Sequence, residues 1–197
     1  MRPDPLALIR EALDESARVK HALREQAEDI LFVAERVAAS FRAGNRLYAC
    51  GNGGSACDAM HLVEELVARF KLDRPGLPAH HLLDAPTLTC WSNDYGFPTA
   101  FQRQVETLVR PGDVLIAIST SGDSPNILLA AEAAHACDAL VVGLTGHDGG
   151  RLRELCDECL IVPSRATERI QEGHITIIHL LCELVERILF GDLQPVA

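Results

Sequence analysis

The stretch PGDVLIAISTSGDSPN, residues 111–126, is the part of the sequence from which the fold is predicted. Val114 to Ile118 is an uninterrupted apolar run, which is typical of a strand buried on both faces. The turn signal Pro111-Gly112-Asp113 precedes this run, and Pro125 suits the first position of a following helix. The stretch therefore predicts a strand, a hydroxyl-rich loop and a helix, in that order.

Short apolar runs alternate with helical patterns on both sides of this stretch. The predicted strands cover residues 46–50, 81–83, 114–118, 140–144 and 159–162. The longer helices predicted after the first strand cover residues 56–70, 85–93, 98–109, 125–137 and 168–190. Strands that alternate with helices favour a parallel sheet with helices on both faces. We therefore expect a three-layer α/β fold that a long C-terminal helix closes.

The N-terminal region has a different pattern, with two helices in succession. Apolar residues recur there at helical spacing in two groups, which are Leu6, Ile9, Leu13 and Val19, and then Ile30, Val33, Val37, Ala38 and Phe41. The chain has 197 residues and no evident internal repeat. We expect one domain over residues 1–197, with residues 1–43 as a helical N-terminal extension.

The charge balance limits the classes of partner. The chain carries 28 acidic and 18 basic residues, a formal net charge of -10. Nucleic acid is therefore not an expected partner, because binding to its backbone needs clustered cations. An anionic small molecule is still compatible with this charge, provided that local donors such as helix N-termini bind it.

The termini and the cysteines indicate a cytoplasmic protein. No signal core follows Met1, and no apolar run approaches the ~20 residues of a membrane span. Cys156 and Cys159 form one CxxC pair without a second pair, which is weak support for a zinc ribbon. We expect the seven cysteines to be reduced and structural.

Two loops at the expected carboxyl ends of strands have unusual compositions. Gly51 to Ser55 contains three glycines and a serine, and Ser119 to Ser124 contains four hydroxyl groups. Free amides and hydroxyls at a helix N-terminus can bind a phosphate. A tight strand–helix turn explains the first loop equally well. A helix cap by Ser124 is the alternative for the second loop, although capping needs only one of its hydroxyls.

Two helices carry candidate acid–base or metal-binding side chains. His61 and Glu65 are four residues apart on one helix face, as a metal site or a base with its partner requires. A solvated face is the alternative. Gln171 and His179 lie on the last helix, where about 12 Å of rise separates them. His179 in its apolar surroundings also fits a satisfied core histidine.

Taken together, these motifs resemble a known family. The segments that carry the resemblance are Gly51-Asn52-Gly53-Gly54-Ser55, His61 with Glu65, Asn93-Asp94-Tyr95-Gly96-Phe97, Ser119-Thr120-Ser121-Gly122-Asp123-Ser124, Leu144-Thr145-Gly146 with Asp148-Gly149-Gly150, and Arg169-Ile170-Gln171-Glu172 with His179. They resemble the sedoheptulose-7-phosphate (phosphoheptose) isomerases of the sugar isomerase (SIS) domain group. The serine turn, residues 119–124, indicates by itself only the broad group. The motifs together cover nearly the whole chain and are specific to this branch.

The resemblance implies a fold, an assembly and a reaction. It implies a flavodoxin-like sheet and a homotetramer with active sites at subunit interfaces. The reaction would convert D-sedoheptulose 7-phosphate to D-glycero-D-manno-heptose 7-phosphate through an enediol, for nucleotide-activated heptose. Such a reaction needs a base for the carbon-bound proton and an acid for the carbonyl oxygen.

The resemblance also implies roles for individual residues. Glu65 and His179 would transfer the protons. The residues that would bind the substrate are Asn52, Gly53, Gly54, Glu65, Asn93, Asp94, Ser119, Thr120, Ser121, Ser124 and Gln171. In zinc-containing members, the ligands of one zinc per subunit would correspond to His61, Glu65, Gln171 and His179. Glu168 and Gly173 depart from the family pattern, and neither belongs to the acid–base pair.

Two other interpretations use the same fold. A non-catalytic tetrameric scaffold, similar to a bacterial replication-initiator-associating protein, is suggested by Arg69-Phe70 and Asp73-Arg74-Pro75. The position of His179 is typically not histidine in such scaffolds. A sugar-phosphate sensor would need an attached DNA-binding domain, for which this acidic chain has no spare length. An isomerase assay beside a pull-down with the initiator protein separates the enzyme from the scaffold.

Overall fold

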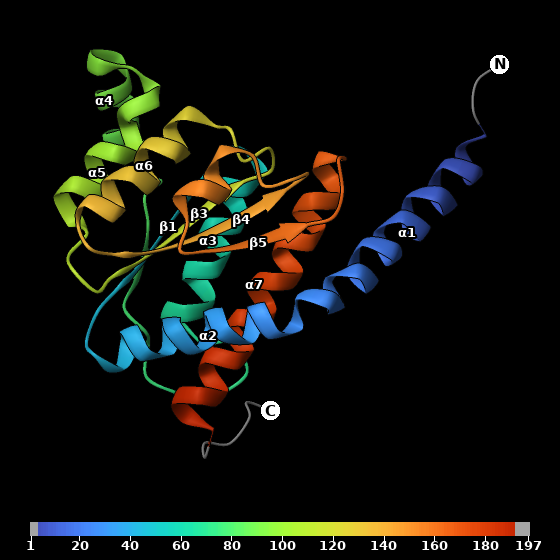
Figure 1. Cartoon of the computed structure of the whole chain (residues 1–197), viewed down its shortest axis with the longest axis horizontal. Coiled ribbons are helices and arrows are strands. Elements are labelled where there is room, and N and C mark those ends of the chain that lie inside the picture. Colours follow the sequence, from blue (N-terminus) through green and yellow to red (C-terminus); the bar gives the residue numbers. More distant parts are fainter. Residues whose placement is uncertain (1–3, 192–197) are drawn as a thin grey trace.

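A five-stranded parallel sheet in the order β2-β1-β3-β4-β5 forms the centre of the molecule (Figure 1). The structure is a computed structural model that describes residues 4–191. The strands are β1 (Leu47–Gly51), β2 (Ala79–His81), β3 (Val114–Ser119), β4 (Leu140–Gly146) and β5 (Glu158–Val162). This order is the flavodoxin-like one. The prediction of a three-layer α/β fold is therefore confirmed.

Helices connect the strands and precede the sheet. The α-helices are α1 (Pro5–Ala22), α2 (Ala27–Arg42), α3 (Gly54–Val67), α4 (Ala85–Tyr95), α5 (Ala100–Leu108), α6 (Pro125–Ala136) and α7 (Thr167–Phe190). Three short 3₁₀ segments are η1 (Leu23–Gln26), η2 (Phe97–Thr99) and η3 (Arg151–Leu155). No helix in the stretch from residue 4 to residue 191 has the length and apolarity to cross a membrane.

Alternate residues of the central strand β3 enter two separate hydrophobic cores. Ile116 and Ile118 pack in the core that α2, α3 and α7 cover. Leu115 and Ala117 pack in the core on the other face, under α5 and α6. All six residues of β3 are buried, as the uninterrupted apolar run predicts. The sheet thus separates the α3–α7 side of the molecule from the α4–α6 side.

The N-terminal region forms the two predicted helices, which differ in their environment. Ile30, Val33 and Val37 of α2 are buried in the same core as α7. In contrast, α1 extends away from the sheet, and Val19 is its one buried residue (Figure 1). Helix α2 is therefore an integral part of one layer, and α1 is the element that projects.

Most element boundaries differ slightly from the sequence prediction, and the shifts of β2 and α3 bear on the site. The edge strand β2 lies at Ala79–His81, two residues before the predicted position, because the apolar pair Leu82-Leu83 follows the strand. Helix α3 begins at Gly54 and ends at Val67. The glycine loop, residues 51–55, therefore runs directly into the helix.

Gly173 now has a physical explanation. It lies where α7 crosses β5, and a Cβ at this position would come within 2.6 Å of Val162 Cγ1. Val162 is fully buried, so the valine cannot move aside freely. The glycine permits the close approach of the long helix to the sheet.

Candidate active site

The glycine loop and the serine turn lie side by side at the carboxyl edge of the sheet. They follow the neighbouring strands β1 and β3, whose residues Gly51 and Ile118 are paired. In the strand order 2-1-3-4-5, the topological switch point falls between these two strands. Ligands bind at such a crevice in open parallel sheets. The predicted phosphate-binding loops therefore meet at the position that the topology favours.

The serine turn uses its hydroxyls within the loop and not as a helix cap. Ser119 Oγ donates to Ser124 Oγ over 3.1 Å and accepts from Gly122 N over 3.2 Å. Ser121 Oγ accepts from Asp123 N. Ser124 occupies the N-cap position of α6, yet its side chain makes no capping hydrogen bond. The capping interpretation of Ser124 is therefore wrong, and its hydroxyl faces Ser119 across the turn.

A pair of amides joins the two loops. Asn52 Nδ2 donates to Asn126 Oδ1 over 2.9 Å, and Asn126 Nδ2 donates to Asn52 Oδ1 over 2.8 Å. Asn126 is only 3% exposed. The sequence interpretation named Asn52 and missed Asn126. The available signal was a polar residue in the first turn of an otherwise apolar helix.

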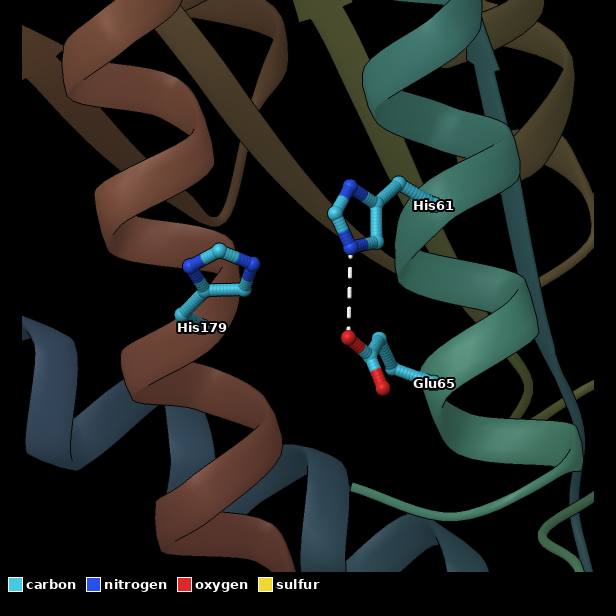
Figure 2. Close-up of side chains that lie close together, drawn as sticks. All are labelled: His61, Glu65 and His179. Carbon is cyan, nitrogen blue, oxygen red and sulfur yellow. Dashed lines mark hydrogen bonds and ion pairs between the residues drawn. The ribbon is translucent and has the colours of Figure 1, made fainter. Parts of the chain in front are cut away.

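His61, Glu65 and His179 converge between α3 and α7, as Figure 2 shows. One ligand atom from each of them lies within 4.8 Å of the other two. His61 Nε2 is 3.2 Å from Glu65 Oε1. The imidazole of His179 meets that of His61 edge-on, with 5.1 Å between ring centroids. Glu65 has a side chain only 16% exposed, so the solvated-face interpretation does not describe it.

The three side chains meet because α3 and α7 run in the same direction. At one end, a Cβ on Gly54 would overlap the carboxamide of Gln171. Seven and eight residues further along the two helices, roughly 10–12 Å away, His61 faces His179. Gln171 is therefore placed at the glycine loop and His179 at the level of the His61–Glu65 pair.

Asp58 is a titratable group near this cluster that the sequence interpretation missed. It lies three residues before His61 on α3, and thus on the same helix face. Burial raises the pKa of its carboxyl to about 6, and the charge of His61 partly opposes this shift. Asp58 lies three residues from His61 and seven residues from Glu65. This helical spacing was the sequence signal that could have identified Asp58.

Asn93 and Asp94 occupy a different part of the molecule. Both are exposed near the end of α4, where Asn93 Nδ2 donates to Asp94 Oδ1 over 2.8 Å. None of the residues of α4 is buried. Since α4 packs on the α5–α6 side of the sheet, a single chain does not bring these two residues to the His61–Glu65–His179 cluster.

The cluster has the donor set of a metal site. Two imidazole nitrogens and a carboxylate oxygen are ligands that suit zinc, and catalytic zinc sites use three such protein ligands. Donor atoms within 4.8 Å of one another need only small side-chain adjustments to contact one ion. His61, Glu65 and His179 therefore fit a metal ion.

Comparisons with known proteins agree with the fold and identify the family. The SIS domain family matches residues 13–146, which is more than half of the chain. The fold and this match define a SIS-domain protein. A phosphoheptose isomerase from Trichlorobacter lovleyi is 52% identical over 160 residues, which cover 81% of this chain and 82% of that protein.

Two solved structures extend the comparison. A phosphoheptose isomerase from Neisseria gonorrhoeae has a TM-score of 0.88 and 38% identity, covering 93% of this chain and 99% of that one. A phosphoheptose isomerase from Francisella tularensis has a TM-score of 0.91 and 36% identity, covering 94% and 100%. The chain belongs to the phosphoheptose isomerase family and is therefore an enzyme of the isomerase class. These names favour the enzyme over the scaffold.

Proposed function

We propose that this chain converts D-sedoheptulose 7-phosphate to D-glycero-D-manno-heptose 7-phosphate through an enediol. The observation that carries the proposal is the approach of Glu65 to His179 between α3 and α7. Relatives named phosphoheptose isomerase, about half identical in sequence, support the substrate. The product would feed the synthesis of nucleotide-activated heptose in the cytoplasm.

The two ends of the substrate would bind to different parts of the site. Ser119, Thr120, Ser121 and Ser124 would hold the phosphate, together with Asn52, Gly53, Gly54 and the start of α6. Gln171 would contact the sugar beside Gly54. A sugar chain that runs along α3 from this loop would reach His61 and Glu65. Binding energy at the phosphate would then orient the reacting carbons.

Glu65 and His179 would divide the proton transfers. Glu65 removes the proton from C1 of the open-chain ketose, and His179 donates a proton to the oxygen at C2. The enediol then loses the proton of its C1 hydroxyl and gains a proton at C2, so no atom is gained or lost overall. The ring of Phe70, which stacks on His179 at 5.7 Å, would limit access of water to that face of the imidazole.

We also propose that His61, Glu65 and His179 hold one zinc ion per subunit. When bound, zinc would polarise the carbonyl and hydroxyl oxygens of the sugar and take over part of the acid role of His179. The further role of Gln171 as a ligand stays a prediction, because its carboxamide lies against Gly54.

A homotetramer with interfacial active sites is the assembly that we propose. The exposed α4 carries Asn93 and Asp94 on the far side of the sheet from Glu65. In an interfacial site, α4 of one subunit would supply these two side chains to another subunit. The apolar side chains exposed on α1 are further surface for such contacts.

The test is an isomerase assay with sedoheptulose 7-phosphate, with and without a chelator. Glu65→Gln and His179→Ala should each lower kcat by about 10²–10⁴-fold while substrate binding persists. Glu64→Gln, at the exposed neighbouring position, is the matched control and should keep its activity. Near-normal turnover in either site variant would refute the assignment. Full activity after complete removal of metal would refute an essential zinc only.

A further inference from the structure

A buried ion pair lies outside the proposed acid–base site. Arg74 Nε is 2.8 Å from Glu186 Oε1, and the two side chains are 0% and 1% exposed. Removing two charges from water is costly, so a buried pair persists only where further hydrogen bonds satisfy both groups. The proton transfers proposed above use neither residue. The location of this buried ion pair therefore needs another explanation.

The carboxylate of Glu186 binds one short segment of chain, residues 70–74. Its Oε1 accepts from Phe70 N over 2.9 Å as well as from Arg74, and its Oε2 accepts from Lys71 N and Leu72 N over 2.8 and 3.1 Å. A carboxylate has about four acceptor positions, and segment 70–74 fills all of them. The carboxylate on α7 thereby determines the position of this segment.

Arg74 uses its Nη donors on the last turn of α3 and on the carbonyl of Pro75. Its Nη2 donates to the carbonyl of Glu65 over 2.9 Å, and its Nη1 donates to the carbonyl of Leu66 over 2.7 Å. Carbonyls at a helix C-terminus lack partners within the helix. The guanidinium therefore caps the last turn of α3, which carries the proposed base Glu65 and ends at Val67.

Segment 70–74 also forms one side of the environment of His179. The ring of Phe70 stacks on the imidazole at 5.7 Å with 21° between the planes. His61 contacts the same imidazole edge-on. Glu186 lies seven residues after His179, two turns further along the same face of α7. One helix face thus carries both the imidazole and the carboxylate that holds Phe70 against it.

We propose that Arg74 and Glu186 are positioning residues, which set the separation and orientation of Glu65 and His179 through segment 70–74. This inference rests on the proposed function, because it assigns the acid–base roles to that pair. General acid–base catalysis depends on hydrogen-bond geometry first, and a misplacement of about 1 Å can cost about 10²-fold in rate. A buried, fully satisfied clamp supplies this accuracy.

Two variants separate positioning from stability. Arg74→Lys keeps a positive charge beside Glu186 but loses the planar fork that reaches the carbonyls of Glu65 and Leu66. Phe70→Leu leaves the buried pair intact and removes only the aromatic face against His179, so it provides the test if Arg74→Lys fails to fold. Arg36→Lys is the control, since Arg36 pairs with Glu158 on another part of the sheet at 2.9 Å.

The measurements are kcat and KM of each variant, beside its thermal stability. We expect at least a tenfold loss of kcat in Arg74→Lys and Phe70→Leu with KM within twofold of wild type, because an orientation effect appears in kcat. Arg36→Lys should change none of these quantities.

The outcomes distinguish this inference from the proposed function. A folded Phe70→Leu variant with wild-type kcat would overturn the positioning role, even where Glu65→Gln is inactive. Lowered thermal stability in Arg74→Lys with unchanged kcat would overturn it too, since the pair would then be purely structural. A wild-type protein without isomerase activity would overturn the proposed function and this inference with it.

Discussion

His174 is a buried histidine on the same helix as His179, and its environment has a consequence for stability. It is fully buried, and its Nε2 lies 2.9 Å from the carbonyl oxygen of Thr145. Burial lowers the pKa of His174 from 6.5 to about 4, and the hydrogen bond to Thr145 only partly opposes this shift. The neutral imidazole is therefore the form that the folded protein accommodates.

This pKa predicts how stability depends on pH. Between pH 4 and 6.5, the unfolded chain binds a proton at His174 that the folded chain does not. The contribution of His174 to stability is thus fully present above pH 6.5 and declines as the pH falls toward 4, by about 3 kcal/mol in total.

Urea unfolding of wild type and His174→Gln at several pH values measures this contribution. The glutamine amide can still donate to Thr145 but does not titrate, so the variant should lose less stability in acid. A constant difference between the two proteins would contradict the prediction.

For the site residues, the sequence predicted some of the side chains but not the side chains that they contact. His61 and Glu65 could be paired in advance because residues four apart on a helix are neighbours. The meeting of Glu65 with His179 depends on the parallel packing of α3 and α7, which no local spacing encodes. Asn126 was missed for the same reason, since its partner Asn52 belongs to another loop.

Elements were predictable where their apolar pattern was strong. The run at β3 gave its strand nearly to the residue, and the long helix α7 began one residue before the predicted start. The edge strand β2 was misplaced, because its three residues Ala79, His80 and His81 carry too little apolar pattern to mark a strand. Helix α4 was predicted from its sequence, but its lack of buried residues was not.

The contact between α7 and β5 gives a prediction at the scale of elements. Alanine at Gly173 would improve helix propensity by about 1 kcal/mol, but its Cβ would lie within 2.7 Å of both methyl groups of Val162. Overpacking of a buried contact costs about 1–3 kcal/mol. We therefore expect Gly173→Ala to lower the free energy of unfolding by up to about 2 kcal/mol, measured by urea denaturation.

A double-mutant cycle with Val162→Ala provides the control for this prediction. If the overlap is the cause, Gly173→Ala should cost less in the Val162→Ala background, with a coupling energy above about 0.5 kcal/mol. Additive losses would show that the glycine acts through something other than Val162.

At the scale of the whole molecule, the strongest unexplained feature is the exposed surface of α1. Leu6, Ile9 and Leu13 are 59%, 56% and 65% exposed on a helix that projects from the sheet. Their spacing of three and four residues puts them on one face. Such an apolar stripe in water favours burial against another copy of the chain, in agreement with the proposed tetramer. The composition alone could not predict this, because the same stripe fits an intramolecular contact.

The stripe gives the last prediction. The double substitution Ile9→Glu with Leu13→Glu should shift the sedimentation equilibrium toward smaller species, because it places two charges in an apolar contact. The matched control is Arg18→Glu, which changes the net charge by the same two units and lies nine residues, about half a helical turn, around α1 from Ile9. The control should keep the oligomeric state of wild type.

Circular dichroism should show a folded protein for wild type, the double variant and the control, because α1 contributes only Val19 to the core. If the double variant keeps the oligomeric state of wild type, the apolar stripe of α1 does not hold the subunits together. Should it dissociate and lose isomerase activity together, the active site depends on the neighbouring subunit, as the proposed interfacial role of Asn93 and Asp94 predicts.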